Sequence, residues 1–250
     1  MEALALAGLA AWCFAIAAGG GLVGLVLGNL RLPVMVSLAS SASAGAGANI
    51  ATSGVTAIAA GVVHVRAGRV DWRLVRWMTP PSMAFAFVGG YLSGAMPEAL
   101  LLVIIAAVLL WSGIDLLQKR SAPPRPTGDE PNLRAAVASA AAIGLLGGIV
   151  GLILGALRMP ALLRWVGAEP HDAVGTNLIV GVGVGAAGVA GHLPGDGPDW
   201  RLFAIAATAS IPGALLGARL TGRLNRRQLL TGIGILLLVA AAGMIVSAAT

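Results

Sequence analysis

The sequence predicts an all-α integral membrane protein of about eight transmembrane helices, built as two homologous four-helix halves. Three observations support this fold class. Only 10% of the 250 residues are charged and 58% are hydrophobic, whereas soluble domains carry roughly a quarter of charged residues. Long apolar runs recur along the chain, and the second half of the sequence repeats the first.

Eight apolar runs are each long enough to cross the roughly 30 Å hydrocarbon core of a bilayer as a helix. Helices are favoured over a β-barrel because the runs do not alternate polar and apolar residues, as the strands of a barrel do. The expected spans are residues 4–28, 42–63, 73–95, 98–118, 134–157, 173–192, 201–222 and 227–247.

The repeat is clearest in two glycine-rich stretches. GGLVGLVLGNLRLP at 20–33 and GGIVGLILGALRMP at 147–160 agree at ten of fourteen positions. Further along, the motif DWRL at 71–74 returns at 199–202. We therefore expect two four-span repeats. They are joined by a charged, proline-rich linker that is expected to be extended and exposed to water. The predicted boundaries are 1–118 for the first repeat, 119–133 for the linker and 134–250 for the second repeat.

The number of spans in each half bears on how the halves are related. Four is an even number, so each half is expected to begin and end on one side of the membrane. The repeats would then run parallel, related by an axis along the membrane normal. Nine Lys and Arg residues fall on the side of the termini and seven opposite. With Arg31 and Arg158 set apart as site residues, the balance favours cytoplasmic termini in a multi-pass protein of the cell inner membrane.

The glycines of the two glycine-rich stretches are three or four residues apart and share one face of a helix. A smooth glycine face allows close helix packing. So much glycine also weakens a helix and favours a break in the first helix of each half. Both interpretations stay open for the eight glycines, which are Gly20, Gly21, Gly24, Gly28, Gly147, Gly148, Gly151 and Gly155.

Each glycine-rich stretch ends in an arginine followed two residues later by a proline. We expect a helix break there and a new helix starting at Pro33 and at Pro160, because proline suits the first turn of a helix. A guanidinium beside a helix N-terminus is a good receptor for a small oxyanion. Arg31 and Arg158 are therefore candidate anion ligands; the alternative is that both reach lipid phosphates at the ends of the spans.

Polar side chains also stand inside the predicted spans. Asn49 in the first half corresponds to Asn177 in the second, and Thr176 precedes Asn177 where the first half has Ala48. Such side chains bond either to a ligand or to a neighbouring helix. We count all three as candidate substrate ligands, in an asymmetric site.

Three histidines lie near the ends of spans. Because histidine as a residue type can exchange protons near neutral pH, His64, His192 and His171 are candidates for proton coupling, with an interfacial position as the alternative. The repeated Asp-Trp-Arg is expected to anchor the start of a span rather than to act chemically, because Asp caps helices and Trp prefers the interface. Asp115, near the end of the fourth span, is expected to face water.

No enzyme signature occurs in the sequence, which lacks a nucleotide loop, a Cys/His metal cluster and a nucleophile beside a base. We expect no catalytic residue, no metal and no cofactor. The basic residues behind the net charge of +6 lie in short loops, so no nucleic acid partner is expected. The expected partners are the lipid bilayer and a small anionic substrate, and a homo-oligomer is left open. The lone Cys13 is expected to pack in the core.

Several of these motifs together resemble the sulfite exporter TauE/SafE family of integral membrane proteins. The resemblance covers nearly the whole chain and is carried by the glycine-rich first spans, Pro170 with Ala173-Val174-Gly175-Thr176-Asn177-Leu178, Gly191-His192 with Asp199-Trp200, and GARLTGRL at 217–224. In the first half, SAGAGAN departs from the usual pattern. The resemblance implies a secondary transporter of the inner membrane for sulfite, organosulfonates or related anions.

From the residues themselves we expect a proton- or ion-coupled carrier of a small oxyanion, which is bound between the halves and released by rocking. Two alternatives remain open. One is a passive anion channel built from the same arginines, and the other is a non-transporting membrane scaffold or assembly factor.

Overall fold

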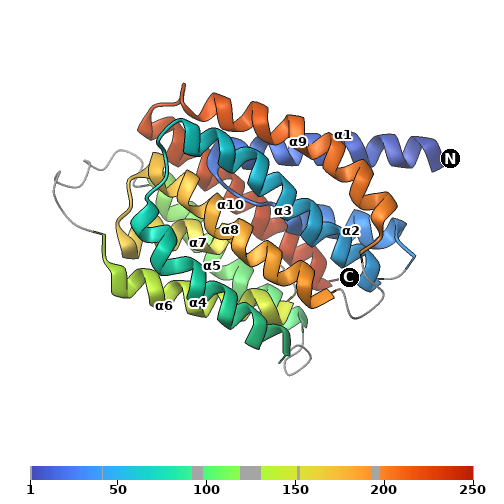
Figure 1. Cartoon of the computed structure of the whole chain (residues 1–250), viewed down its shortest axis with the longest axis horizontal. Helices are drawn as coiled ribbons and strands as arrows, with labels where there is room; N and C mark the ends of the chain where they lie inside the picture. The colour runs from blue at the N-terminus through green and yellow to red at the C-terminus, as the bar shows by residue number, and fades with distance from the viewer. Residues whose placement is uncertain are drawn as a thin grey trace.

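The computed structural model describes residues 2–40, 42–91, 98–118, 131–150, 153–192 and 198–249. In these residues the fold is all helical, as predicted, with ten α-helices and one π-helical turn (Figure 1). The elements are α1 (Glu2–Val23), α2 (Gly28–Leu38), α3 (Ala42–Arg66), α4 (Trp72–Tyr91), α5 (Glu98–Gln118), α6 (Leu133–Val150), α7 (Gly155–Ala161), η1 (Leu162–Val166), α8 (Pro170–His192), α9 (Trp200–Thr221) and α10 (Arg226–Ala249).

The first helix of each half is broken, and the chain reverses at the break. Gly24 has a φ of +70°, a left-handed conformation that costs glycine little and other residues much. After it, α2 runs back along α1, since the indole Nε1 of Trp12 donates to the carbonyl of Leu30 at 3.0 Å. In the second half the N–H of Asn132, just before α6, donates to the carbonyl of Val166 in η1 at 2.9 Å. Both halves therefore begin with a helical hairpin.

The predicted start of the new helices at the prolines is wrong. The helices after the breaks begin at Gly28 and Gly155, so Pro33 and Pro160 fall in their second turns. In the first half the chain reverses at Gly24, whose positive φ makes the reversal possible. A proline in a short helix removes only one backbone hydrogen bond, so the break does not have to coincide with it.

The predicted parallel arrangement of the halves is also wrong. A Cβ placed on Gly185 of α8 would lie 3.3 Å from Gly54 of α3, and one on Gly61 of α3 would lie 2.9 Å from Ile179 of α8. Higher residue numbers in α3 thus meet lower numbers in α8, and these equivalent helices run antiparallel. The hairpin is the cause, because its second arm adds a change of direction that a count of four spans omits.

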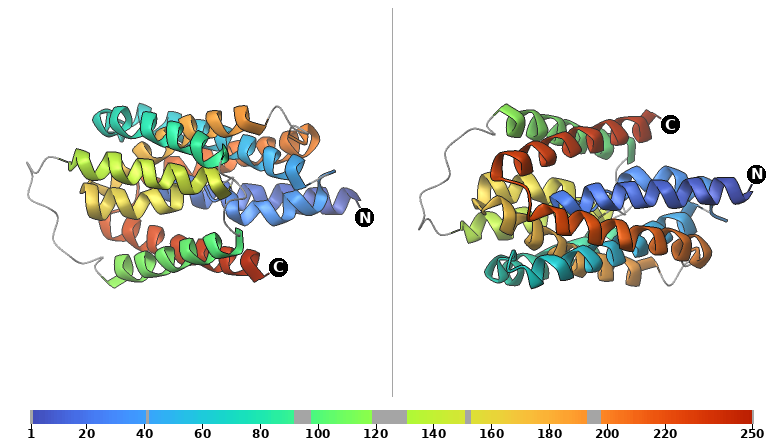
Figure 2. Two further views of the ribbon diagram at one scale, coloured as in Figure 1. Left: turned by 90° about the horizontal axis from the view of Figure 1, so that it is seen from below. Right: turned by 90° about the horizontal axis from the view of Figure 1, so that it is seen from above.

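The bundle is held together mainly by helices from opposite halves. The most extensive pairings are α1 with α9, α4 with α6 and α5 with α10, followed by α3 with both α8 and α9. Figure 2 shows α1 alongside α9 in one view and α5 beside α10 in both. The two termini lie toward one end of the bundle, and the end of α5 and the start of α6 lie at the other (Figure 1). We call these the terminal end and the linker end.

Four helices of the described part are long and apolar enough to cross a membrane, judged by length and composition: α1, α3, α9 and α10. The predicted aspartate caps are confirmed. The carboxylate of Asp71 accepts from the N–H of Leu74 at 3.0 Å, and that of Asp199 accepts from Arg201 and Leu202 at 3.1 Å.

Two smaller expectations have different outcomes. Cys13 is buried in an apolar cluster with Leu9 and Met35, as expected. Asp115 does not simply face water, because its carboxylate pairs with Arg164 of η1 at 3.1 Å. The Arg164 guanidinium also lies 3.9 Å from the ring centre of Trp111. Residues 119–130, most of the predicted linker, lie outside the described part.

Glycine permits the close approach of α1 and α9, and this contact predicts an unequal response to alanine. At Gly217 of α9 an added Cβ would overlap the carbonyl of Ala18, so Gly217→Ala should lower the free energy of unfolding by about 1–3 kcal/mol. At Gly54 of α3 nothing lies within 4 Å of the added atom. Gly54→Ala should therefore be neutral or slightly stabilising. Thermal unfolding in detergent compares the two, and equal losses would contradict the packing described.

Candidate functional site

The tips of the two hairpins meet against the middle of α8. A Cβ placed on Gly181 would lie 3.8 Å from a methyl of Val26 and 3.9 Å from a methyl of Ile153. These residues belong to the break before α2 and the break before α7. A Cβ placed on Gly155 would lie 3.5 Å from the backbone nitrogen of Val26. The interrupted segments of both halves are thus neighbours inside the bundle.

Arg31, in the first turn of α2, is 1% exposed and enclosed by polar side chains. Its Nη2 donates to Oγ of Ser53 at 2.6 Å, and its Nε donates to Oδ1 of Asn49 at 3.4 Å. Its Nη1 donates to Ser210 of α9 at 3.3 Å and to Thr56 at 3.5 Å. Every nitrogen of this guanidinium therefore has a partner within the protein.

Arg158, at the equivalent position of α7, is also 1% exposed. Its Nη1 donates to Oδ1 of Asn177 at 3.1 Å and, more weakly, to the Asn177 carbonyl at 3.5 Å. Its Nε is buried and has no hydrogen-bond partner. The second guanidinium thus keeps an unused donor in the interior.

Neither guanidinium has a carboxylate partner within the described part of the chain, unlike Arg164, which pairs with Asp115 at 3.1 Å. A buried charge without a partner of opposite sign is strongly unfavourable. Lipid phosphates do not reach two side chains that are 1% exposed, so this arrangement does not fit the snorkelling alternative. It fits a site that binds an anion.

Asn177 connects Arg158 to both helix breaks. Its Nδ2 donates to the carbonyl of Gly24 at 2.6 Å and to that of Gly155 at 3.0 Å, while its Oδ1 accepts from Arg158. Thr176 lies elsewhere, because its hydroxyl accepts from the backbone N–H of Asp71 at 2.9 Å. The structure therefore pairs Arg31 with Asn49 and Arg158 with Asn177, and places Thr176 against the α3–α4 loop.

The remaining site candidates lie in several parts of the structure, and two of them lie at the breaks. Gly28 lies against Ser53 and Asn49, and Gly155 lies against Asn177. Gly21 contributes to the contact of α1 with α9, since its added Cβ would lie 2.5 Å from the carbonyl of Ala214. The other outcomes are that Gly20 faces Leu25, Pro33 is exposed, Pro160 and Gly147 are buried, Gly151 lies outside the described part, and the surroundings of Gly148 are not described.

Sequence reasoning missed the hydroxyl groups around Arg31. Ser53 and Thr56 follow Asn49 by four and seven residues, the spacing of one helix face. That spacing is a signal that the sequence carries. Ser210 is different, because it comes from α9 of the other half and only the tertiary fold brings it to Arg31.

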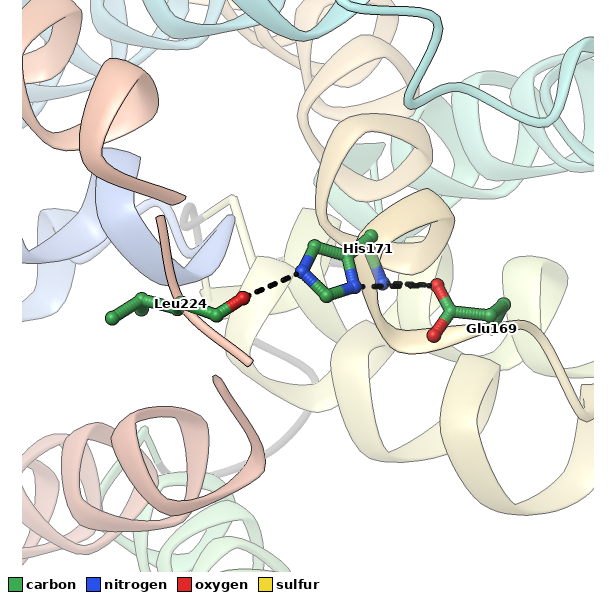
Figure 3. A network of polar contacts seen from close by, with 3 residues as sticks. All are labelled: Glu169, His171 and Leu224. Atoms are coloured by element: carbon green, nitrogen blue, oxygen red, sulfur yellow. Dashed lines mark hydrogen bonds and ion pairs between the residues drawn. The ribbon is translucent and has the colours of Figure 1, made fainter. Parts of the chain in front are cut away.

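The histidines lie apart from the arginine contacts. His64 is buried, with Nε2 3.4 Å from the carbonyl of Gly21 and Nδ1 without a partner. His171 lies at the linker end, where its Nε2 is 3.1 Å from the carbonyl of Leu224 and its Nδ1 is 3.6 Å from the Glu169 carboxylate (Figure 3). A carbonyl only accepts, so Nε2 of His171 must carry the proton. The side chain of His192 lies outside the described part.

Broken helices whose tips meet inside the bundle, beside buried arginines that pair with no carboxylate of the described residues, define a class of protein. Irregular backbone and permanent charges at this depth are typical of helical membrane proteins that bind solutes or ions between their halves. The comparison with known families agrees with this class.

The chain belongs to the sulfite exporter TauE/SafE family, whose model matches residues 9–244. The resemblance noted in the sequence is thereby confirmed over nearly the whole chain. Membership makes the protein a multi-pass membrane protein of a transporter family. No curated protein and no solved structure gives a significant match.

The two asparagines should differ in their importance for stability. Asn177→Ala removes the only side-chain acceptor of Arg158 in the described part and both bonds to the breaks, so we expect a loss of about 2–4 kcal/mol. Asn49→Ala should cost less, because Arg31 keeps Ser53 as its closest partner. Denaturation of the two variants in the same detergent measures the difference. A larger loss for Asn49→Ala would contradict this arrangement of contacts.

Proposed function

We propose that the protein is a secondary transporter that moves a small oxyanion across the inner membrane, with sulfite as the first candidate, and binds it at Arg158. The observation that carries this proposal is the buried Nε of Arg158, which has no partner although its guanidinium cannot lose its charge. The family supplies the candidate anion.

The chemistry of a guanidinium suits such an anion. Nε and Nη2 point along one edge of the group, and two oxygens of an oxyanion fit this edge side by side. In Arg158 the opposite nitrogen, Nη1, is held by Asn177, so the group is oriented before the anion arrives. A sulfite bound at Nε would supply the negative charge that this part of the interior lacks.

We further propose that all eight long helices span the membrane and that the halves are inverted repeats related by an axis in the membrane plane. Equivalent contacts support this symmetry. The pairing of α1 with α9 corresponds to that of α6 with α4. A Cβ on Gly47 would lie 3.0 Å from Pro198, and one on the equivalent Gly175 would lie 2.9 Å from Val70. Rocking of one half against the other would expose the site alternately to the two sides.

Among the histidines, His64 is the best candidate for proton coupling in this carrier. It is buried beside Gly21, close to the tip of the first hairpin, and its Nδ1 has no partner. His171 is occupied by contacts at the linker end. The coupling role of His64 and of His192 stays a prediction.

The inverted arrangement also changes the expected orientation. Of the 16 Lys and Arg residues, Arg31 and Arg158 are buried and Arg201 belongs to the terminal end. The others belong to the linker end or to the linker itself: Arg66, Arg69, Arg73, Arg76, Lys119, Arg120, Arg125, Arg134, Arg164, Arg219, Arg223, Arg226 and Arg227. Because positive residues gather on the cytoplasmic side, we propose a cytoplasmic linker end and external termini. This is opposite to the orientation expected from the sequence, where the same residues were divided between the two sides on the assumption of four spans in each half.

Transport of sulfite tests the function. Arg158→Gln removes the charge and the fork of donors, so sulfite uptake into vesicles should fall at least about a hundredfold, as for loss of a buried charged partner. Arg158→Lys keeps the charge without the planar fork and should retain a small part of the activity. Arg66→Gln, at an exposed position of α3, serves as the control and should transport normally.

The same assay separates the alternatives. Saturable uptake that collapses when the proton gradient is removed indicates a coupled carrier, whereas linear uptake that follows the anion gradient alone indicates a channel. Undiminished sulfite uptake by Arg158→Gln would contradict the proposed site.

Orientation is tested by fusions and labelling. Alkaline phosphatase fused after Thr250 should be active, because it matures only outside the cytoplasm, and a fluorescent protein fused there should be dark. In a Cys13→Ala background, Ser121→Cys in the linker should react with an impermeant maleimide only after the cells are opened. The reverse pattern would contradict external termini.

A further inference from the structure

The two arginines occupy equivalent positions in the sequence but have different surroundings. We infer, on the basis of the proposed function, that the transporter has one anion site and not two: Arg158 binds the anion, and Arg31 is a structural tether whose anion-binding edge is filled by the protein itself.

The difference lies in the hydroxyl groups that surround Arg31. At an offset of 128 residues, Ser53 corresponds to Gly181 and Thr56 corresponds to Val184. The second half therefore lacks two of the acceptors that enclose Arg31. Ser210 does have an equivalent, Ser82, but its hydroxyl donates to the carbonyl of Ala140 at 3.2 Å.

The consequence for binding follows from which nitrogens remain free. In Arg31, Nε and Nη2 form the edge suited to an oxyanion, and they already donate to Asn49 and Ser53. An anion would have to displace both partners. In Arg158 the Nε of the same edge is buried and has no partner, so an anion gains a bond there without breaking one. The side-chain oxygens around Arg31 take the place that the anion's oxygens take at Arg158.

The same contacts explain what Arg31 does instead. It links α2 to α3 through Asn49, Ser53 and Thr56, and to α9 through Ser210. The hairpin of the first half is thus fixed to two long helices. The Arg158 side chain, by contrast, is bound to one residue of α8, Asn177.

The sharpest test restores the missing hydroxyl. A Cβ on Gly181 meets only ordinary contacts, at 3.8 Å and 3.9 Å, so both alanine and serine fit there. Because Gly181 is equivalent to Ser53 in the repeat, we expect the hydroxyl of Gly181→Ser to reach Arg158 and to compete there with the anion. We expect the dissociation constant for sulfite, from thermal-shift titration of the purified full-length protein, to rise about tenfold. Gly181→Ala, which adds the same carbon without the hydroxyl, should stay within about twofold.

A second variant addresses Arg31 directly. Arg31→Gln should lower the melting temperature, while sulfite added to the folded variant should bind within about threefold of its original strength. Arg158→Gln should abolish the sulfite-dependent shift. Chloride at the same ionic strength controls for general salt effects.

The outcomes separate the two proposals. Equal sulfite constants for Gly181→Ser and Gly181→Ala, or loss of the sulfite shift in a folded Arg31→Gln protein, would overturn the single-site inference and leave the transport proposal intact. A folded wild-type protein that ignores sulfite would contradict the proposed function, and the single site with it.

Discussion

The architecture depends on a reversal of the chain inside the first helix of each half. In the first half the reversal uses Gly24, whose φ of +70° would strain any residue with a side chain. Because the second arm returns toward the starting side, the following helices run opposite to the directions that uninterrupted spans would have. Equivalent helices of the two halves then lie antiparallel, and the interrupted segments meet at Gly181 in the middle of α8. In the first half, the position of Arg31 follows from this backbone conformation.

The surroundings of the two buried arginines reflect two requirements that oppose each other. A permanent charge in the interior is unfavourable unless polar groups surround it. Arg31 satisfies this requirement with neutral oxygens from three side chains of α3 and one of α9. Arg158 satisfies it only in part, since its Nε has no partner. An incompletely satisfied cation is a weakness in a purely structural role, but it is what a reversible anion site needs.

The sequence predicted much of the local structure and less of the global arrangement. Composition and the repeat predicted the helical class, and the aspartate caps at Asp71 and Asp199 followed from their position before apolar runs. The repeat also placed an arginine and an asparagine at equivalent positions of both halves, so their pairing could have been inferred from the sequence. The direction of α2 was not, because glycine permits a reversal without requiring one. The pairs Arg164 with Asp115 and Arg31 with Ser210 join distant segments, which no local pattern reveals.

The pairing of helices across the halves has a consequence for how the protein is made. Helix α1 packs most extensively on α9, whose first residue, Trp200, leaves the ribosome long after the N-terminal helix has been synthesised. Contacts between segments so far apart in the chain form late and slowly. Until then the face of α1 that packs on α9 lacks this neighbour, and the newly inserted first half is exposed to misassembly. Biogenesis of this transporter should therefore depend on the insertion machinery keeping the early helices apart until the last ones arrive.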